Sequence, residues 1–216
     1  MKFIHPHLRI YLPLTILVLL IGCILLFLVP KVDGHLFVNS THTAFLDFFF
    51  TYFTHVGGGA FVAVGSALLT ALFWKRFQYS LLILASFNLI LVAAITQFLK
   101  QIIFSDAMRP IKFIGAKILH TAPGVEVHTS NSFPSGHTAA GFAFFALVAF
   151  LYGKNKWIQV LCAVTAVLVG YSRIYLSQHF LEDTVLGGAI GLGCFLLSYA
   201  IVSSFKIGRQ LKPIIE

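Results

Sequence analysis

His179 and Asp183 stand four positions apart, a spacing that could pair an imidazole with a carboxylate. Residues four apart on a helix share one face and can touch. A carboxylate beside a histidine fixes its tautomer, favours its protonated form and leaves the other ring nitrogen free to attack or to bind. Glu182 is one step away on such a helix and should point elsewhere. Taken alone, the pair is also what an interfacial histidine beside a helix-capping aspartate would give.

The run Pro134-Ser135-Gly136-His137 opens a long apolar stretch and should therefore lie at the N-terminus of a helix. Unpaired backbone N–H groups and the positive end of the helix dipole suit an oxyanion there. Gly136 would let a ligand approach the main chain closely, Ser135 would add a hydroxyl donor and His137 a titratable proton. An ordinary N-terminal cap with a histidine nearby is the alternative for this run alone.

Three cationic side chains could converge on one anion: Lys100 and Arg109, after the third predicted span, and Arg173, at the end of the fifth. Arginine offers a planar fork that matches phosphate oxygens, and lysine offers a point charge. The alternative is anchoring of helix ends at the membrane surface, which is the interpretation we adopt for Lys112 and Lys117.

The three clusters together predict phosphoryl transfer through a histidine nucleophile. The sequence contains no thiolate cluster, no His-Glu-x-x-His and no acidic pair suited to Mg²⁺, so we expect neither a metal nor a cofactor.

The composition determines which kind of protein must position these residues. Of 216 residues, 58% are hydrophobic and 10% are charged, whereas charged residues make up about a quarter of soluble domains. A soluble fold of this size could not bury so much apolar surface, so soluble, disordered and disulfide-rich secreted proteins are excluded. The three cysteines all lie in apolar runs and are interpreted as packing residues: Cys23, Cys162 and Cys194.

We therefore predict an all-α, polytopic membrane protein forming a single domain over residues 1–216. Stretches without Asp, Glu, Lys or Arg, compared with the roughly 20 residues that cross a bilayer, predict six transmembrane helices, at 10–29, 58–74, 79–99, 137–152, 157–175 and 184–205. The first is interpreted as an uncleaved anchor because its apolar run is long and no Ala-x-Ala-like site follows. The aromatic segment 42–57 predicts a short interfacial helix, ended by Gly57-Gly58-Gly59.

The charge distribution predicts the orientation in the membrane. With the N-terminus inside, the outer segments contain six basic and six acidic residues, and the inner segments contain nine basic residues and one acid, Glu216. The inner basic residues are Lys2, Arg9, Lys75, Arg76, Lys154, Lys156, Lys206, Arg209 and Lys212. All three clusters then lie on the outer face, within or beside the long loop 100–136 and the connection before the sixth span. The net charge of +8 reflects topology and contact with anionic lipid, with no nucleic-acid partner required.

These residues resemble the three-part signature of the type 2 phosphatidic acid phosphatase superfamily of membrane lipid phosphatases. Pro-Ser-Gly-His is complete at 134–137, and Ser172-Arg173, five residues, His179, three residues and Asp183 complete the third part. The first part is a lysine, a spacer usually of six residues, and Arg-Pro. Here eight residues separate Lys100 from Arg109, so Lys100 lies either on the phosphate, as we assign it, or displaced toward the entrance.

The resemblance implies roles for the matching residues. His179 would attack phosphorus and form a phosphohistidine, Asp183 would orient and charge-stabilise His179, and His137 would protonate the leaving oxygen and then activate water. The phosphate oxygens would be held by Lys100, Arg109, Arg173, Ser135 and the Gly136 amide. Soluble vanadium haloperoxidases share the signature, but the membrane composition excludes them.

An outward-facing site at bilayer depth predicts a phosphatase acting on a phosphate monoester or pyrophosphate of a lipid, at the periplasmic face of a bacterial inner membrane. The bacterial assignment rests on analogy, from the short soluble tails. Phosphatidic acid, phosphatidylglycerol phosphate, undecaprenyl pyrophosphate and lipid A phosphates all fit. The alternatives are a lipid phosphotransferase using the same site, and a transporter or scaffold with a vestigial site. Intact motifs and the absence of ionisable residues in the middle of the spans disfavour the last of these.

Overall fold

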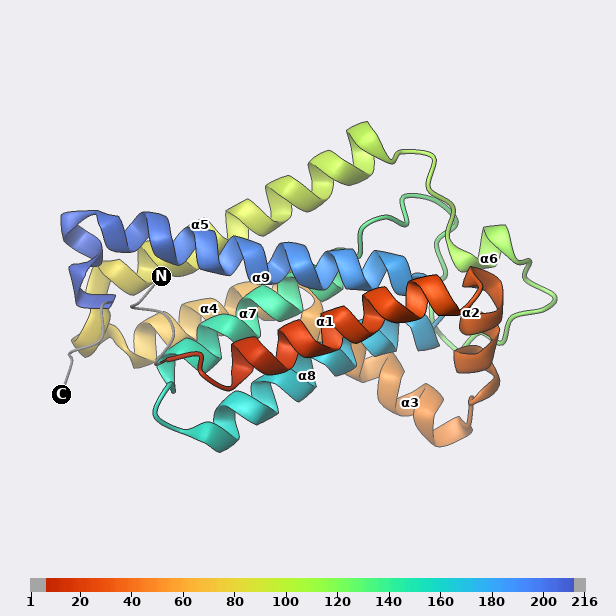
Figure 1. The fold of residues 1–216 in the computed structure, drawn as a ribbon, viewed down its shortest axis with the longest axis horizontal. Helices are drawn as coiled ribbons and strands as arrows, with labels where there is room; N and C mark the ends of the chain where they lie inside the picture. The colour runs from red at the N-terminus through yellow and green to blue at the C-terminus, as the bar shows by residue number, and fades with distance from the viewer. Residues whose placement is uncertain (1–6, 212–216) are drawn as a thin grey trace.

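The structure, a computed structural model, describes residues 7–211 and is all-helical over that range (Figure 1). Lys2, Lys212 and Glu216 lie outside the described residues. The α-helices are α1 (Tyr11–Leu28), α2 (Lys31–Ser40), α3 (Ala44–Phe53), α4 (Gly59–Leu72), α5 (Trp74–Phe98), α6 (Pro110–Phe113), α7 (Gly136–Leu151), α8 (Lys156–Tyr175) and α9 (Leu181–Ser204). Shorter turns are the 3₁₀ turns η1 (Thr54–Gly57) and η3 (Lys206–Leu211) and the π-helical turn η2 (Leu99–Ile103).

Helix α7 forms the centre of the bundle and packs against α9, α8 and α5. Its buried surface extends almost all round the helix, because these neighbours surround it. Small residues on α9 let the backbones of α7 and α9 approach closely. A Cβ atom on Gly191 would lie 2.1 Å from the carbonyl oxygen of Ala139, and one on Gly187 would lie 2.6 Å from that of Ser135. Such backbone contact between small residues is typical of helices packed inside membranes. It holds the N-termini of α7 and α9 side by side.

Four helical segments are long and apolar enough to cross a bilayer: α1, α5 with η2, α8 and α9. The bent pair of α3 with η1 and α4, which turn by 56° at Gly58, would add a fifth if it forms one span. Helix α7 is apolar but shorter. Large apolar side chains on α1 are exposed, for example Leu20 at 55% and Phe27 at 91%, as a lipid-facing surface requires. The chain is therefore an integral membrane protein with four or five candidate spans.

Each predicted span overlaps a helix, although α5 begins at Trp74 rather than 79, and three further predictions about the elements need correction. Helix α2 was not predicted. Helix α9 begins at Leu181 rather than 184, because the Asp183 carboxylate accepts a hydrogen bond from Phe180 N at 3.0 Å and caps the first turn. The predicted interfacial helix 42–57 is α3 followed by η1, and extended backbone at Gly58 separates it from α4. That break leaves α4 shorter than the predicted second span.

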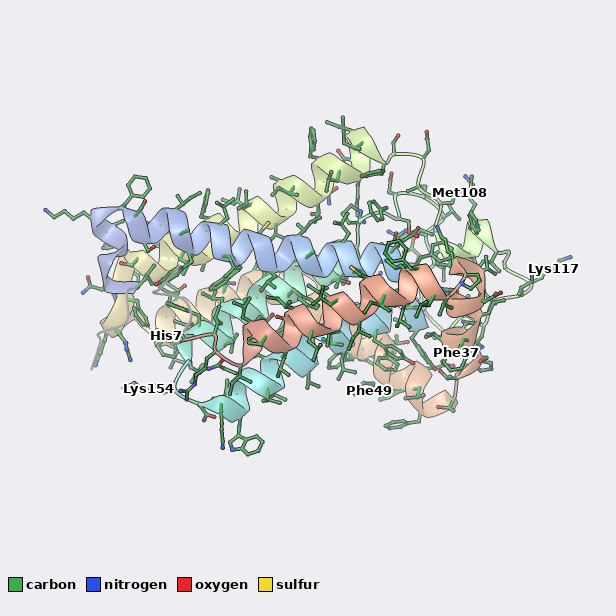
Figure 2. The ribbon with its side chains drawn as sticks, viewed as in Figure 1. His7, Phe37, Phe49, Met108, Lys117 and Lys154 are labelled. Atoms are coloured by element: carbon green, nitrogen blue, oxygen red, sulfur yellow. The ribbon has the colours of Figure 1, made fainter. Side chains whose placement is uncertain are left out.

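The segments predicted for opposite faces of the membrane lie at opposite ends of the molecule. His7 and Lys154 lie at one end, near η3, and Met108 and Lys117 lie at the other, near α2 and α6 (Figure 2). In Figure 1, α5 diverges from the bundle toward the end that holds the long loop.

Candidate active site

His179 and Asp183 are in contact, with Nδ1 of the histidine 3.1 Å from Oδ2 of the aspartate, and each residue is 1% exposed. The spacing predicted that the two residues share one face of a helix, but the structure makes the contact in another way. His179 lies in the turn between α8 and α9, and Asp183 lies in the first turn of α9. The same aspartate oxygen accepts a hydrogen bond from Ser132 Oγ and one from Phe180 N. Nδ1 is thus occupied, and Nε2 is the ring nitrogen left for chemistry.

The electrostatic surroundings of His179 differ from the sequence prediction. We expected Asp183 to favour the protonated ring. Instead, burial lowers the pKa of His179 well below its usual value, and three cations, Arg173, Arg109 and Lys100, lower it further. A carboxylate can only accept a hydrogen bond, so Nδ1 of the neutral ring donates to Asp183 and Nε2 carries the lone pair. A neutral imidazole in this tautomer is suited to nucleophilic attack.

Arg109 is fixed by backbone carbonyl groups on both sides. Its Nε donates to Ser130 O at 2.8 Å, and its Nη1 donates to Gln178 O at 2.9 Å and to Gln178 Oε1 at 3.1 Å. The guanidinium is thereby locked beside the turn that carries His179, although Arg109 comes from the long loop. Such a fixed fork is suited to holding phosphate oxygens.

Lys100 reaches the same place despite the eight-residue spacer. Its Nζ donates to Asn131 O at 3.2 Å, next to the Ser130 carbonyl that holds Arg109. Lys100 lies in the π-helical turn η2, where Phe104 N bonds back to Leu99 O. A π turn takes up one residue more than an α turn, and such turns occur often at functional sites. The longer spacer is therefore partly absorbed before the chain leaves the helix.

At the N-terminus of α7, Ser135 and Gly136 have different roles in the site. Ser135 is fully buried, and its Oγ accepts from Thr138 N and from Thr138 Oγ1, while its own N donates to Asp183 O. Its hydroxyl is thus a helix cap; its predicted phosphate contact stays a prediction. Gly136 faces free space, since a Cβ atom there would meet no atom within 4 Å.

A cavity of about 370 Å³ brings most of the predicted site residues together. Lining it are Lys100, Arg109, Gly136, His137, Arg173 and His179, with apolar walls from α5 such as Leu89 and Val92. Asp183 and Ser135 are absent from the lining; the first contacts His179 and the second caps α7. Among residues 7–211, no group of three or more His, Cys, Asp or Glu is placed to hold a metal ion.

Four residues that support the site were missed by the sequence analysis. Asn131 and Ser132 precede the Pro-Ser-Gly-His motif, Gln178 precedes His179, and Thr54 accepts a hydrogen bond from Arg173. Their contacts join distant segments and follow no helical spacing. The run of polar residues 130–132 before Pro134 was the one available signal.

The fold and the cavity define an integral membrane protein in which a buried histidine, a helix N-terminus and three cations surround one site suited to an oxyanion. Residues 81–206 match the PAP2 superfamily, and the chain belongs to this superfamily.

Individual relatives match parts of the chain. Phosphatidylglycerophosphatase B of Bacillus subtilis (strain 168) is 36% identical over 93 residues, covering 39% of this chain and 46% of that protein. The undecaprenyl-diphosphatase of Sulfolobus acidocaldarius is 34% identical over 109 residues, covering 49% of this chain and 50% of that protein. This chain thus spans half or less of these two relatives. The crystal structure of Aquifex aeolicus LpxE is similar with a TM-score of 0.62 and 25% identity, covering 79% of this chain and 94% of that one.

Proposed function

We propose that this protein is an integral-membrane phosphatase that removes phosphate from a lipid monoester or diphosphate through a phosphohistidine at His179. The observation that carries the proposal is the single cavity lined by His179, His137, Gly136 and three cations. A dianionic phosphoryl group needs such a concentration of positive charge, and preorganised charge is worth most in a site that excludes water.

In the first step, Nε2 of neutral His179 attacks phosphorus, forming a P–N bond as the bond to the lipid oxygen breaks. The electron pair leaves with that oxygen. His137, protonated once the dianionic phosphoryl group occupies the cavity, supplies its proton. In the second step, neutral His137 takes a proton from water, the hydroxide attacks phosphorus, and the P–N bond breaks to release inorganic phosphate and His179. Lys100, Arg109, Arg173 and the Gly136 amide balance the charge on the phosphoryl oxygens.

The proposal includes six spans, with α4 and α7 as short members, both termini in the cytoplasm and the cavity at the periplasmic face of a bacterial inner membrane. The support is the uneven distribution of basic residues between the two ends of the bundle. The test is labelling of single cysteines in intact cells, in a chain without native cysteines. Lys117→Cys should react before lysis and Lys154→Cys only after it. The opposite pattern would move the chemistry to the cytoplasm.

The substrate is proposed from the relatives' chemistry, since one relative's name gives phosphatidylglycerophosphate and another's gives undecaprenyl diphosphate as the substrate. Phosphatidic acid and lipid A phosphates offer the same group. The decisive experiment measures phosphate release by purified protein from these four lipids, with His179→Ala as the control. Release that depends on His179 supports the proposal, and no release from any of them contradicts it. Transfer of phosphate to an added alcohol instead of water would identify a phosphotransferase.

A further inference from the structure

The 3₁₀ turn η1 touches the candidate site although it lies outside the region that matches the family. Gly57 lines the cavity, and a Cβ atom on it would lie only 2.7 Å from the carbonyl oxygen of His137. The backbone of η1 therefore packs directly on the first turn of α7. This close packing places the side chain of Thr54, at the start of η1, within reach of α8.

Thr54 meets the guanidinium of Arg173. Nη1 of the arginine donates to Thr54 Oγ1 at 2.8 Å in a buried contact. Arg173 is 7% exposed and lines the cavity, and its Nε has no hydrogen-bond partner among the described residues. A buried donor without a partner costs free energy, so an anion in the cavity is the partner that this arrangement lacks.

The two arginines of the cavity are held in different ways. Arg109 donates to three carbonyl oxygens of the backbone and to the side-chain oxygen of Gln178, so its position is fixed by the long loop and the turn before α9. For Arg173 the structure gives one acceptor, the hydroxyl of Thr54, within residues 7–211. A hydroxyl is neutral, so it can orient the guanidinium without cancelling the charge that phosphate needs, as a carboxylate would.

We propose that Thr54 is a positioning residue that turns Arg173 so that its remaining N–H groups face the phosphoryl group. The inference rests on the proposed function, and it adds a residue from outside the signature motifs to the phosphate site. Because the contact acts through Arg173, its effect should be largest where charge on the phosphoryl oxygens is greatest, in the transition state.

The test compares Thr54→Val, which removes the acceptor, with Thr54→Ser, which retains it. Thr51→Val is the matched control, because the Thr51 hydroxyl lies one turn earlier, is buried and has no hydrogen-bond partner. The first readout is the vanadate concentration that raises the melting temperature of the purified protein halfway, since a ligand of the folded state stabilises it. We expect Thr54→Val to need roughly 10- to 100-fold more vanadate, the effect of losing a hydrogen bond to a charged group. Thr54→Ser and Thr51→Val should stay within about twofold of the wild type.

The second readout is steady-state hydrolysis, where Thr54→Val should lower kcat with little change in KM. A merely structural role would lower the melting temperature without vanadate and leave the vanadate titration unchanged, and that result would overturn the proposal. Equal losses in Thr54→Val and Thr54→Ser would overturn it too. If Thr54→Val does not fold, Thr54→Ala replaces it in the same comparison.

A double variant tests whether Thr54 acts through Arg173. In an Arg173→Lys background, Thr54→Val should add less than about twofold to the vanadate requirement, whereas a full additional loss would refute the coupling. The vanadate titration needs no turnover. If vanadate binding shows the expected dependence on Thr54 but the wild-type protein hydrolyses no lipid, the proposed function alone is contradicted. An active wild type with an unaffected Thr54→Val variant would contradict this inference alone.

Discussion

The turn between α8 and α9 has two polar sides, and they handle charge in opposite ways. On the cavity side are Lys100, Arg109 and Arg173, and none of them has a carboxylate partner within 4 Å among residues 7–211. On the far side, Ser177 Oγ lies 3.2 Å from His35 Nε2 and accepts from Asn39 Nδ2 at 3.2 Å.

The far side also contains a carboxylate that has hydrogen-bond partners. Asp47 accepts from the Tyr175 hydroxyl at 2.7 Å and lies 2.8 Å from His120 Nε2. The comparison teaches that a connected hydrogen-bond network with a paired carboxylate marks the scaffold, even though Nδ1 of His35 has no partner among the described residues. Cations without counterions instead mark the place where an anionic ligand completes the structure. We call these two regions the cavity side and the scaffold side of the turn.

The largest effect should come from the histidines of the cavity side. His179→Ala should abolish turnover and leave no phosphoenzyme to trap, since in the proposed mechanism Nε2 of His179 forms the P–N bond. His137→Ala should cost roughly 10²–10⁴-fold on a lipid substrate, the range for general acid catalysis. A nitrophenyl phosphate needs less leaving-group protonation and should partly rescue phosphoenzyme formation in His137→Ala only. Rescue of His179→Ala would show that the two roles are reversed.

Next in size are the cations. Arg109→Ala and Lys100→Ala should each lower kcat/KM roughly 10²–10³-fold on every lipid phosphate, the cost of losing a preorganised electrostatic donor. The measurement is the ratio of the two losses on a small and a large head group. Similar, large losses place Lys100 on the phosphate. A near-normal Lys100→Ala enzyme would instead show that the longer spacer has moved this ammonium to the entrance.

On the scaffold side, His35 should make the free energy of unfolding depend on pH in the acid range. Burial lowers the pKa of His35 from 6.5 to about 4, so the folded protein keeps this ring neutral. The unfolded chain binds a proton below pH 6.5, and stability is therefore complete above that pH and is lost as the pH falls toward 4. The loss should be at most about 3 kcal/mol. Denaturant unfolding of His35→Gln should show a shallower decline over this window than the wild type, and parallel curves would contradict the prediction.

A smaller effect is expected for Tyr175→Phe, which removes one hydrogen bond to Asp47 on the scaffold side. It should lower the free energy of unfolding by about 1–2 kcal/mol and leave kcat per folded molecule unchanged. Tyr171→Phe, one helical turn earlier, is the control that should lose less stability. A large fall in kcat with normal stability would mean that the scaffold side takes part in the chemistry.

The smallest effect should be that of chelation. Three cations already face the cavity, so activity should persist in EDTA, while vanadate, which can adopt the five-coordinate geometry of the transition state, should inhibit. The measurement is phosphate release with and without chelator. Loss in EDTA that Mg²⁺ restores would refute the histidine mechanism.

The sequence predicted the helices well where charge-free runs define them, and less well at their ends. The charged residues Glu182 and Asp183 led to a predicted start at residue 184, whereas α9 begins at Leu181. Acidic residues in the first turn in fact favour a helix. Glu182 does point away from His179, toward Lys31 at 2.6 Å, as expected. Helix α2 was not predicted, because Asp33, Gly34 and other polar residues interrupt its apolar pattern.

The sequence identified six of the residues that line the cavity, and Asp183 beside His179, but not the residues that hold the two arginines. The motifs contain His179, Arg109 and Arg173, whose imidazole and guanidinium groups are suited to the proposed chemistry. Gln178 and Thr54 hold the two arginines through contacts spanning 69 and 119 positions of the chain. No periodicity encodes such contacts, because they depend on how α3, α8 and the long loop pack together. The contact between His179 and Asp183 was predicted correctly, but the predicted reason, a shared helix face, was wrong, because His179 precedes α9.

The π-helical turn around Lys100 has a consequence for detecting distant homologues. A search pattern written with a fixed six-residue interval between lysine and Arg-Pro would reject this chain, although Lys100 and Arg109 both line the same cavity. A widened turn stores an inserted residue without displacing the side chain at its start. The number of residues between two site residues thus depends on the path of the backbone and does not fix the distance between their side chains. Search patterns for such sites should allow this number to vary wherever a helix precedes a loop.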